Sequence, residues 1–319
     1  MQDSPQIRAG RRLGDMLHPQ AVSTLTQSAI TWLLPPAAGL DDIAIPHRPA
    51  GGITLGRLGA LEVRLAGGKR DIRRAQRLRY KVFYRDGTAI ADAATLLARR
   101  DKDGFDSICD HLLVIDHAAR PSLNGSPKVV GTYRLLRHEA ALHHGGFYTE
   151  NEFDITALLA RHPTLAFLEL GRSCVLPRYR NKRTVELLWH GIWAYVRRHR
   201  LDVMIGCASL NGTDPDRLAL PLSFLHHFAA APPAWRARAR EQRRVDMNRI
   251  AKGAIDPRAG LRELPPLIKG YLRLGAVVGD GAVIDHQFGT TDVLIVLPVS
   301  AINARYIAHF GADATRHAA

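Results

Sequence analysis

The sequence predicts an α/β or α+β fold built on one mixed sheet, and three observations support this class. Strand-like and helical segments succeed one another along the chain, and some strands follow each other with no helix between them. Hydrophobic residues make up 46% and charged residues 23% of the 319 residues, which is typical of a folded soluble protein. No internal repeat is present, so we expect one substantial core with additions.

The first regular elements follow a loosely patterned start. Residues 1–55 contain Pro-rich and Gly-rich stretches and predict an N-terminal extension or linker. A strand is expected at 61–65, and residues 69–83 have the apolar spacing of a helix. Two further strands, at 111–116 and 129–137, are joined by a turn-rich connection that predicts a hairpin.

A second strand–helix–strand series comes next. A strand is predicted at 164–176, a helix at about 184–199 and a strand at 201–210. Apolar residues in the helix recur at three- and four-residue spacing, so one face of it is expected to pack on a core.

The C-terminal part completes the expected main domain, residues 56–312. Residues 231–262 are strongly basic and predict a linker or surface helix inserted in that domain. Two strands around a Gly-rich turn at 279–281 are expected within 269–299, followed by a short helix to 310–312.

The charge and the cysteines limit the class of partner and the compartment. A formal net charge of +14 favours an acidic partner, such as nucleic acid, anionic lipid or an acidic protein. Aromatic residues are only 7% and do not alternate with the basic segments, which argues against nucleic acid. Three widely spaced cysteines and the lack of a long apolar run indicate a cytoplasmic protein with no zinc site. The segment 21–38 could at most lie on a membrane surface.

A carboxylate and a basic turn stand out in LELGRSCVLPRYRNKR, residues 168–183. Glu169 lies in an apolar strand near Arg172, and this pattern suits a structural ion pair or a general base. Four cations then crowd the start of a helix, where they form either an anion site or a solvated turn. They are Arg178, Arg180, Lys182 and Arg183, here called the basic turn.

An acidic loop at 101–110 contrasts with its basic surroundings. Its Asp spacing is similar to that of a calcium loop, but the downstream bidentate Glu is missing, so we expect no metal site. The loop could hold a cationic substrate or could simply be solvated. Cys174 has no His partner in the pattern and is expected to be a buried structural thiol.

Four motifs resemble those of a known family, the acyl-homoserine-lactone synthases. Arg79 to Phe83 resembles their RxxVF signature, and Asp103-Gly-Phe-Asp106 resembles the acidic element that follows it. The strand VGTYRLL, which contains Arg134, and the stretch ELGR at 169–172 match two further signatures in the same order. A Trp after VF and the aromatic residue after ELxR are absent, the latter replaced by Ser173.

Residues 60–312 are more similar to hemolysin-like GNAT proteins, a group that includes L-ornithine N-alpha-acyltransferases. LELGRSCV, the basic turn, LLWHGI and the tail from YLRLGA to DVLI carry this resemblance. It implies a GNAT-type acyltransferase fold with a central, mostly antiparallel twisted sheet flanked by helices. The implied reaction moves a 3-hydroxyacyl chain from acyl carrier protein to the α-amine of L-ornithine. The Gly-rich loop that binds coenzyme A pyrophosphate is RYRNKRT here, which favours the single phosphate of a carrier-protein phosphopantetheine.

The resemblance also implies roles for individual residues. Glu169 is expected to be the base, held by Arg172, and backbone N–H groups of Ser173, Cys174 and Val175 are expected to bind the thioester oxygen. Asp103 and Asp106 would hold the ornithine ammonium, while Arg79 and Arg134 would face its carboxylate or brace the acidic loop. The basic turn would bind the phosphate of the donor.

These roles imply no cofactor or metal of the protein's own, since acyl carrier protein carries the phosphopantetheine. The expected partners are acyl carrier protein, L-ornithine and the anionic inner face of a bacterial membrane, without nucleic acid. Two alternatives stay open: another amine acceptor, including an autoinducer-type one, and a non-catalytic basic membrane-binding protein. Asp285 and Asp292 match family positions with no assigned role.

Overall fold

The computed structural model of the protein describes residues 52–121 and 125–302. They belong to one compact unit, Ala37–Ala319. Most of the predicted extension at 1–55 and the short helix expected before 310–312 lie outside the described residues. No helix in the described part is long and apolar enough to cross a membrane.

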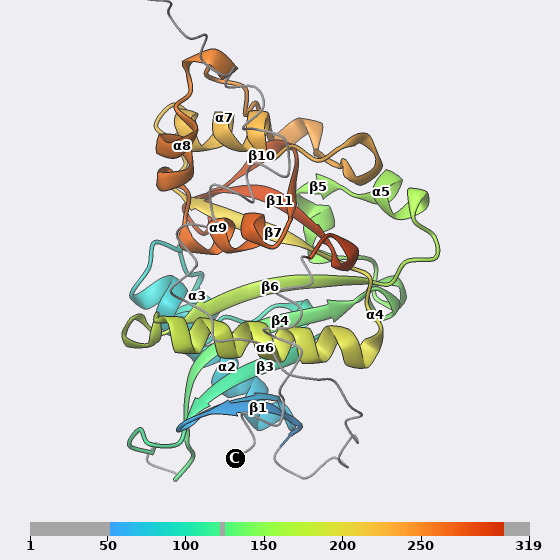
Figure 1. The fold of residues 1–319 in the computed structure, drawn as a ribbon. Helices are drawn as coiled ribbons and strands as arrows, with labels where there is room; N and C mark the ends of the chain where they lie inside the picture. Colours follow the sequence, from blue (N-terminus) through green and yellow to red (C-terminus); the bar gives the residue numbers. More distant parts are fainter. Residues whose placement is uncertain (1–51, 122–124, 303–319) are drawn as a thin grey trace, which may run out of the picture. The chain divides into compact units, whose positions relative to one another are not determined.

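One mixed sheet of eleven strands organises this unit (Figure 1). Its order is β1-β2-β3-β4-β6-β7-β11-β10-β8-β5, and β9 pairs with β10. Neighbours are antiparallel except for β6 with β7 and a single residue pair between β8 and β10. The predicted mixed, mostly antiparallel sheet is therefore confirmed. The strands are β1 Thr54–Leu58, β2 Leu61–Leu65, β3 Asp110–Asp116, β4 Lys128–Arg137, β5 Phe153–Asp154, β6 Phe167–Val175, β7 Val203–Asn211, β8 Arg238–Ala239, β9 Arg244–Val245, β10 Val277–Asp285 and β11 Thr290–Pro298.

Two helices cover opposite faces of the first half of the sheet (Figure 1). Alternate residues of β3 explain this, because successive strand side chains point to opposite faces. Leu112 packs close to Gly191 of α6 (Lys182–His199), while Leu113 and Ile115 form a buried cluster with Ala75 of α2 (Lys69–Tyr80). The predicted helices at 69–83 and 184–199 correspond to these two, and a π-helical turn, Lys81–Arg85, extends α2.

Shorter helices complete the described part. They are α3 Ala93–Ala98, α4 His138–His143, α5 Thr156–Arg161, α7 Ala219–Phe228, α8 Pro257–Glu263 and α9 Pro266–Arg273. The basic segment 231–262 contains the short strands β8 and β9 and the helix α8, so part of it joins the sheet and it is not one continuous surface helix.

The prediction of a Gly-rich turn at 279–281 is wrong. These residues lie inside β10, where the register with β11 shifts between Val278 and Ala282. Gly281 has φ +86°, and a Cβ at Gly279 would lie 3.0 Å from the Ala237 carbonyl oxygen. The glycines therefore serve a bulge and a close strand contact, and the β10–β11 turn falls at 286–289.

Candidate active site

The two parallel strands at the centre of the sheet, β6 and β7, stop pairing early. Three residue pairs join them, the last between Glu169 and Ile205, although β6 continues to Val175 and β7 to Asn211. Beyond this pair each strand keeps its outer partner, β4 or β11. The facing inner edges thus carry backbone groups outside the sheet ladder, which an extended ligand can use.

A bulge in β6 lies just past this point. Gly171 is paired with Arg134 and Cys174 with Thr132, so two residues of β6, Arg172 and Ser173, oppose one residue of β4. Arg172 has φ 50°, a left-handed conformation that costs about 1–2 kcal/mol for a residue with a Cβ. Bulges re-aim side chains and leave a ladder N–H unpaired. The predicted oxyanion segment begins here, since Ser173 is in the bulge and Cys174 and Val175 follow it.

Glu169 is buried, with only 4% of its surface exposed, and its carboxylate is held by three donors. The Tyr148 amide donates to Oε2 at 2.9 Å, and the Thr149 amide donates to Oε1 at 2.6 Å. The Thr149 hydroxyl also donates to Oε1. Burial raises the pKa of Glu169 above its usual range, while these hydrogen bonds act in the opposite direction. The result is a fixed carboxylate at the end of the β6–β7 ladder.

Arg172 projects from the bulge into a cluster of aromatic and acidic groups. Its guanidinium lies 4.8 Å from the Tyr148 ring centre and 4.6 Å from that of Phe288. Asp101 and Asp103 lie 3.5 and 3.4 Å from its nitrogens. Burial opposes its charge, but Tyr148 and these carboxylates raise the pKa of Arg172, so it stays protonated.

The acidic loop is neutralised by two further arginines. Arg79 is 1% exposed and binds Asp101 at 2.7 Å and Asp106 at 2.8 Å. Arg134 donates to both oxygens of Asp103 at 2.6 and 2.7 Å. Although burial would raise it, contact with Arg79 lowers the pKa of Asp106, so this carboxylate is charged. Arg79 and Arg134 thus brace the loop.

An open pocket of about 490 Å³ adjoins this network. It is lined by residues of the acidic loop and by the aromatic and cationic groups just described. They include Asp101, Asp103, Phe105, Tyr148, Arg172 and Gln287.

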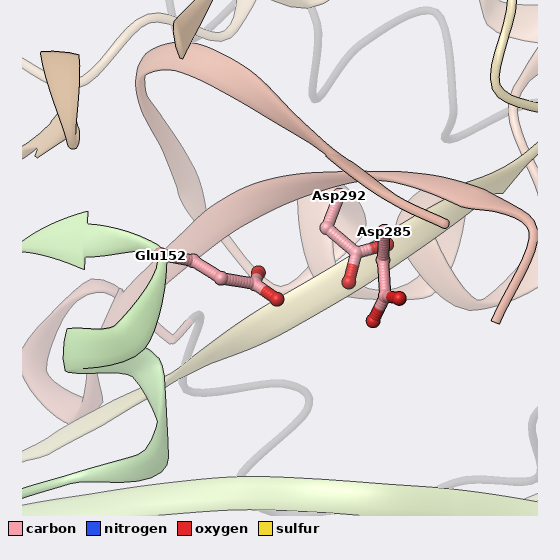
Figure 2. A group of neighbouring side chains, drawn as sticks. All are labelled: Glu152, Asp285 and Asp292. Atoms are coloured by element: carbon pink, nitrogen blue, oxygen red, sulfur yellow. The ribbon is translucent and has the colours of Figure 1, made fainter. Parts of the chain in front are cut away.

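A second acidic group lies beside β7. Glu152, Asp285 and Asp292 come from the segment before β5, the end of β10 and β11, and each has an oxygen within 4.8 Å of the others. Figure 2 shows the three carboxylates turned toward a common point. We call this group the carboxylate cluster.

The basic turn is exposed at the start of α6. Asn181 caps this helix by accepting the Thr184 amide at 3.1 Å, and Arg180 donates to the Val175 carbonyl at 3.0 Å. Arg178, Lys182 and Arg183 are also exposed. The turn therefore presents four cations at the positive end of a helix, directly after β6.

A large basic groove includes a residue that shortly precedes the basic turn in the sequence. It has a volume of about 790 Å³, and Leu176, the residue before Pro177, forms part of its wall. Most of its other lining residues are cationic: Arg70, Arg73, Arg74, Arg77, Lys81 and Lys128.

The structure brings together some predicted site residues and leaves others apart. Glu169 and Arg172 share contacts with Tyr148 or its amide, and Arg172 joins Arg79, Arg134, Asp103 and Asp106 in one network. Within the described residues, the basic turn forms no ion pair with this network. Tyr148, Thr149 and Glu152 were missed, because the irregular segment around them has no periodicity to signal that it packs on Glu169.

The fold and this site define a class of enzyme. In the central mixed sheet, the two parallel strands part beside a buried carboxylate, and a cation-rich helix start follows. This is the arrangement of a GNAT acyltransferase. Residues 78–190 match the Acetyltransferase (GNAT) domain. The chain is 53% identical to the L-ornithine N(alpha)-acyltransferase of Agrobacterium fabrum over 82% of its length and 88% of the relative's. It is 52% identical to the enzyme of that name from Brucella abortus, covering 83% and 93%, and 51% identical to that from Rhizobium meliloti, covering 82% and 88%. The chain belongs to the family of L-ornithine N(alpha)-acyltransferases, and it is an acyltransferase.

Proposed function

We propose that this enzyme transfers a 3-hydroxyacyl chain from acyl carrier protein to the α-amine of L-ornithine, giving lyso-ornithine lipid. The names of its relatives support ornithine as the acceptor. The observation that carries the mechanism is the buried Glu169 at the point where β6 and β7 stop pairing.

The reaction needs a base for the attacking amine. The amine nitrogen forms a bond to the thioester carbonyl carbon and loses a proton to Glu169. Both oxygens of Glu169 already accept protein hydrogen bonds, so a water between the amine and the carboxylate suits this geometry. A positioned base of this kind contributes about 10²–10⁴-fold to the rate.

The tetrahedral intermediate carries a negative oxygen that needs donors. The bulge at Arg172 and Ser173 supplies backbone N–H groups outside the β4 ladder, and the ladder resumes at Cys174 and Val175. Collapse of the intermediate breaks the carbon–sulfur bond, forms the amide and releases the phosphopantetheine thiol with the proton.

Arg172 is suited to the acceptor's carboxylate. Its Nε donates no hydrogen bond within the described residues, although Asp101 lies 3.5 Å away. Asp103, Arg134 and the buried pair of Arg79 and Asp106 would then keep Arg172 and the loop in position. Of the two roles expected for Arg79 and Arg134, we therefore propose bracing of the acidic loop and not direct contact with the substrate.

The basic turn and the basic groove support acyl carrier protein as the donor. A single phosphate at the start of α6 would be bound by Arg178, Arg180, Lys182 or Arg183 without a Gly-rich loop. The groove beside Leu176 offers a cationic surface to an acidic protein. The same charge suits an anionic membrane, which would receive the product, and sedimentation with anionic and neutral vesicles tests that contact.

The test is an acyl-transfer assay with the full chain. 3-Hydroxyacyl carrier protein and the matching coenzyme A thioester are each supplied with ornithine, lysine, norvaline or homoserine lactone, and products are identified by mass. We expect acylated ornithine with the carrier-protein donor as the main product. Transfer only to another amine would replace the acceptor, equal use of coenzyme A would remove the carrier-protein requirement, and no transfer at all would refute the proposal.

A further inference from the structure

The carboxylate cluster forms no ion pair in the described part of the chain, although the charges of Arg243 and Arg172 act on Glu152 and Asp292 from farther away. No Lys, Arg or His nitrogen there lies within 4.0 Å of Glu152, Asp285 or Asp292. Glu152 is 2% exposed and Asp292 is 7% exposed, while Asp285 is half-buried. By contrast, the acidic loop sets three carboxylates against three arginines. Buried carboxylates without a cation are costly, and a ligand cation is one way to offset that cost.

One atom of the cluster points more specifically to a ligand. Glu152 Oε2 is buried and has no hydrogen-bond partner among the described residues, and Figure 2 shows its carboxylate aimed at the other two. Asp292 Oδ1 accepts from the Thr290 hydroxyl at 2.9 Å, and Asp285 Oδ1 accepts from two backbone amides after it. Ser209 also hydrogen-bonds to Asp292, whereas the printed hydrogen bonds of Asp285 use only Oδ1. An unmade hydrogen bond on a buried oxygen is rare in native proteins.

The cluster lies next to the proposed catalytic carboxylate. The Thr149 hydroxyl donates to Glu169 and accepts from the Cys207 thiol at 3.8 Å. Cys207 also lies within hydrogen-bond reach of Glu152 and lowers its pKa, so its single thiol proton can go to either Thr149 or Glu152. Glu169 and Glu152 therefore flank one residue of β7, on the inner edge where β6 and β7 have parted.

We propose that Glu152, Asp285 and Asp292 bind the side-chain ammonium of the acceptor amino acid. This inference rests on the proposed function, because it requires an acceptor with one amine to be acylated and a second that stays charged. An acceptor bound with its α-amine at Glu169 would extend its short side chain past Cys207 to the cluster. This proposal replaces the earlier assignment of the ammonium site to Asp103 and Asp106, because arginines neutralise those two carboxylates.

The number of donors favours an ammonium over a metal ion. A primary ammonium has three N–H donors, one for each carboxylate of the cluster. Calcium takes six to eight oxygen ligands, and magnesium keeps an octahedral shell. L-norvaline, which has the carbon chain of ornithine without the side-chain amine, would leave all three carboxylates unpaired and should be rejected.

The test measures binding and transfer with L-ornithine and L-norvaline. Calorimetry is carried out on the full chain and on Glu152→Gln and Asp292→Asn, in the presence of holo acyl carrier protein. We expect each variant to lose about 30-fold or more in ornithine affinity, as for truncation of a buried charge pair, with norvaline affinity unchanged. The control is Asp280→Asn, a carboxylate of the same strand β10 that is paired with Arg238 and Arg244 and should not alter ornithine binding.

Several outcomes would overturn the inference. Wild-type ornithine affinity in both variants would do so, as would a wild-type protein that does not distinguish ornithine from norvaline. Tight binding of Mg²⁺, Ca²⁺ or Mn²⁺ that both variants abolish and ornithine does not displace would assign the cluster to a metal. Melting curves of each variant show whether it is folded.

The same experiment separates the inference from the proposed function. If the wild type binds ornithine through the cluster but transfers no acyl chain to it, the proposed function fails and the binding site stands. If the wild type acylates ornithine but both variants keep the ornithine-to-norvaline ratio of kcat/KM, the inference alone fails.

Discussion

Glu169 accepts three hydrogen bonds and is buried, so its charge state and its position depend on the same contacts. We expect Glu169→Gln to lower kcat by at least about 100-fold, because it removes the base and places an amide donor against backbone donors. The pH dependence of kcat/KM checks this. Activity should fall as the pH drops through the pKa of Glu169, which burial raises above 4.5, and this acidic limb should vanish in the variant.

A second variant separates catalysis from structure. Thr149→Ala keeps the carboxylate and removes one hydrogen bond that lowers its pKa, so the acidic limb should move to higher pH. A Glu169→Gln enzyme with wild-type kcat would contradict the base assignment. An unchanged pH profile in Thr149→Ala would show that another group causes the limb.

Glu152 makes the stability of the ligand-free protein depend on pH. Burial and the charge of Asp292 raise its pKa to about 7, Asp285 adds to this, and Cys207 and Arg243 act in the opposite direction. Between 4.5 and about 7 the folded state therefore holds a proton that the unfolded chain releases. The free energy of unfolding should fall as pH rises through this window and stay low above it.

Replacing this carboxylate should stabilise the fold. We expect Glu152→Gln to raise the free energy of unfolding at pH 8 by about 1–2 kcal/mol and to give no gain at pH 4, as measured by urea denaturation. Asp280→Asn, which removes a paired carboxylate, should give no such gain. Equal destabilisation by Glu152→Gln at both pH values would mean that the cluster carries no electrostatic cost.

At the scale of elements, two helical glycines differ in what surrounds them. A Cβ at Gly191 of α6 would lie 2.6 Å from Val63 and 3.1 Å from Leu112, whereas nothing lies within 4 Å of one at Gly270 of α9. We expect Gly191→Ala to lower the free energy of unfolding by about 1–3 kcal/mol through overpacking. Gly270→Ala should raise it by about 0.5–1 kcal/mol through helix propensity. Denaturation of the two variants side by side checks both signs, and a stabilised Gly191→Ala would show that α6 can move away from the sheet.

Local pattern was sufficient to predict the longer elements. The strands predicted at 61–65 and 129–137 and the helical spacing in 184–199 correspond to β2, β4 and α6. Shorter pieces could not be predicted in this way. β1 is a five-residue edge strand containing Gly56, whose Cβ would meet His190, and β5 and β8 have two residues each. Such strands are defined by their partners and not by their own periodicity.

The candidate site was only partly predictable for the same reason. Glu169, Arg172 and the acidic loop stand out because they interrupt apolar or basic segments. The carboxylate cluster does not, since Glu152 is more than a hundred residues from Asp285 and Asp292 and only the sheet brings them together. That they form no ion pair within the described residues is a property of packing and cannot be read from composition.

At the scale of the whole molecule, the net charge of +14 should govern how the donor associates. Long-range attraction between a basic enzyme and an acidic carrier protein is screened when salt shortens the Debye length from about 14 Å to below 6 Å. We expect KM for 3-hydroxyacyl carrier protein to rise several-fold between about 0.05 and 0.3 M NaCl, while KM for ornithine changes less. Steady-state kinetics at the two salt concentrations provide the test.

Charge-reversal variants in the basic groove test whether the carrier protein binds there. Arg73→Glu and Arg77→Glu should raise KM for the carrier-protein donor and reduce its salt dependence, without altering KM for a small pantetheine thioester. Arg217→Glu, which changes an exposed arginine outside the groove, is the matched control. Equal effects of all three substitutions would indicate a non-specific contribution of net charge.

The early end of the β6–β7 ladder also has a consequence for how the protein opens. Strands β1 to β4 and β6 form one half of the sheet, and strands β5 and β7 to β11 form the other. Within the sheet, the three residue pairs between β6 and β7 join the two halves. We expect the halves to exchange amide hydrogens as separate cooperative units, with the slowest amides inside each half and faster ones along the joint. The amide groups of the donor's phosphopantetheine arm, laid between β6 and β7, would supply the missing hydrogen bonds. Donor binding should therefore merge the two units and slow exchange at amides far from the thioester.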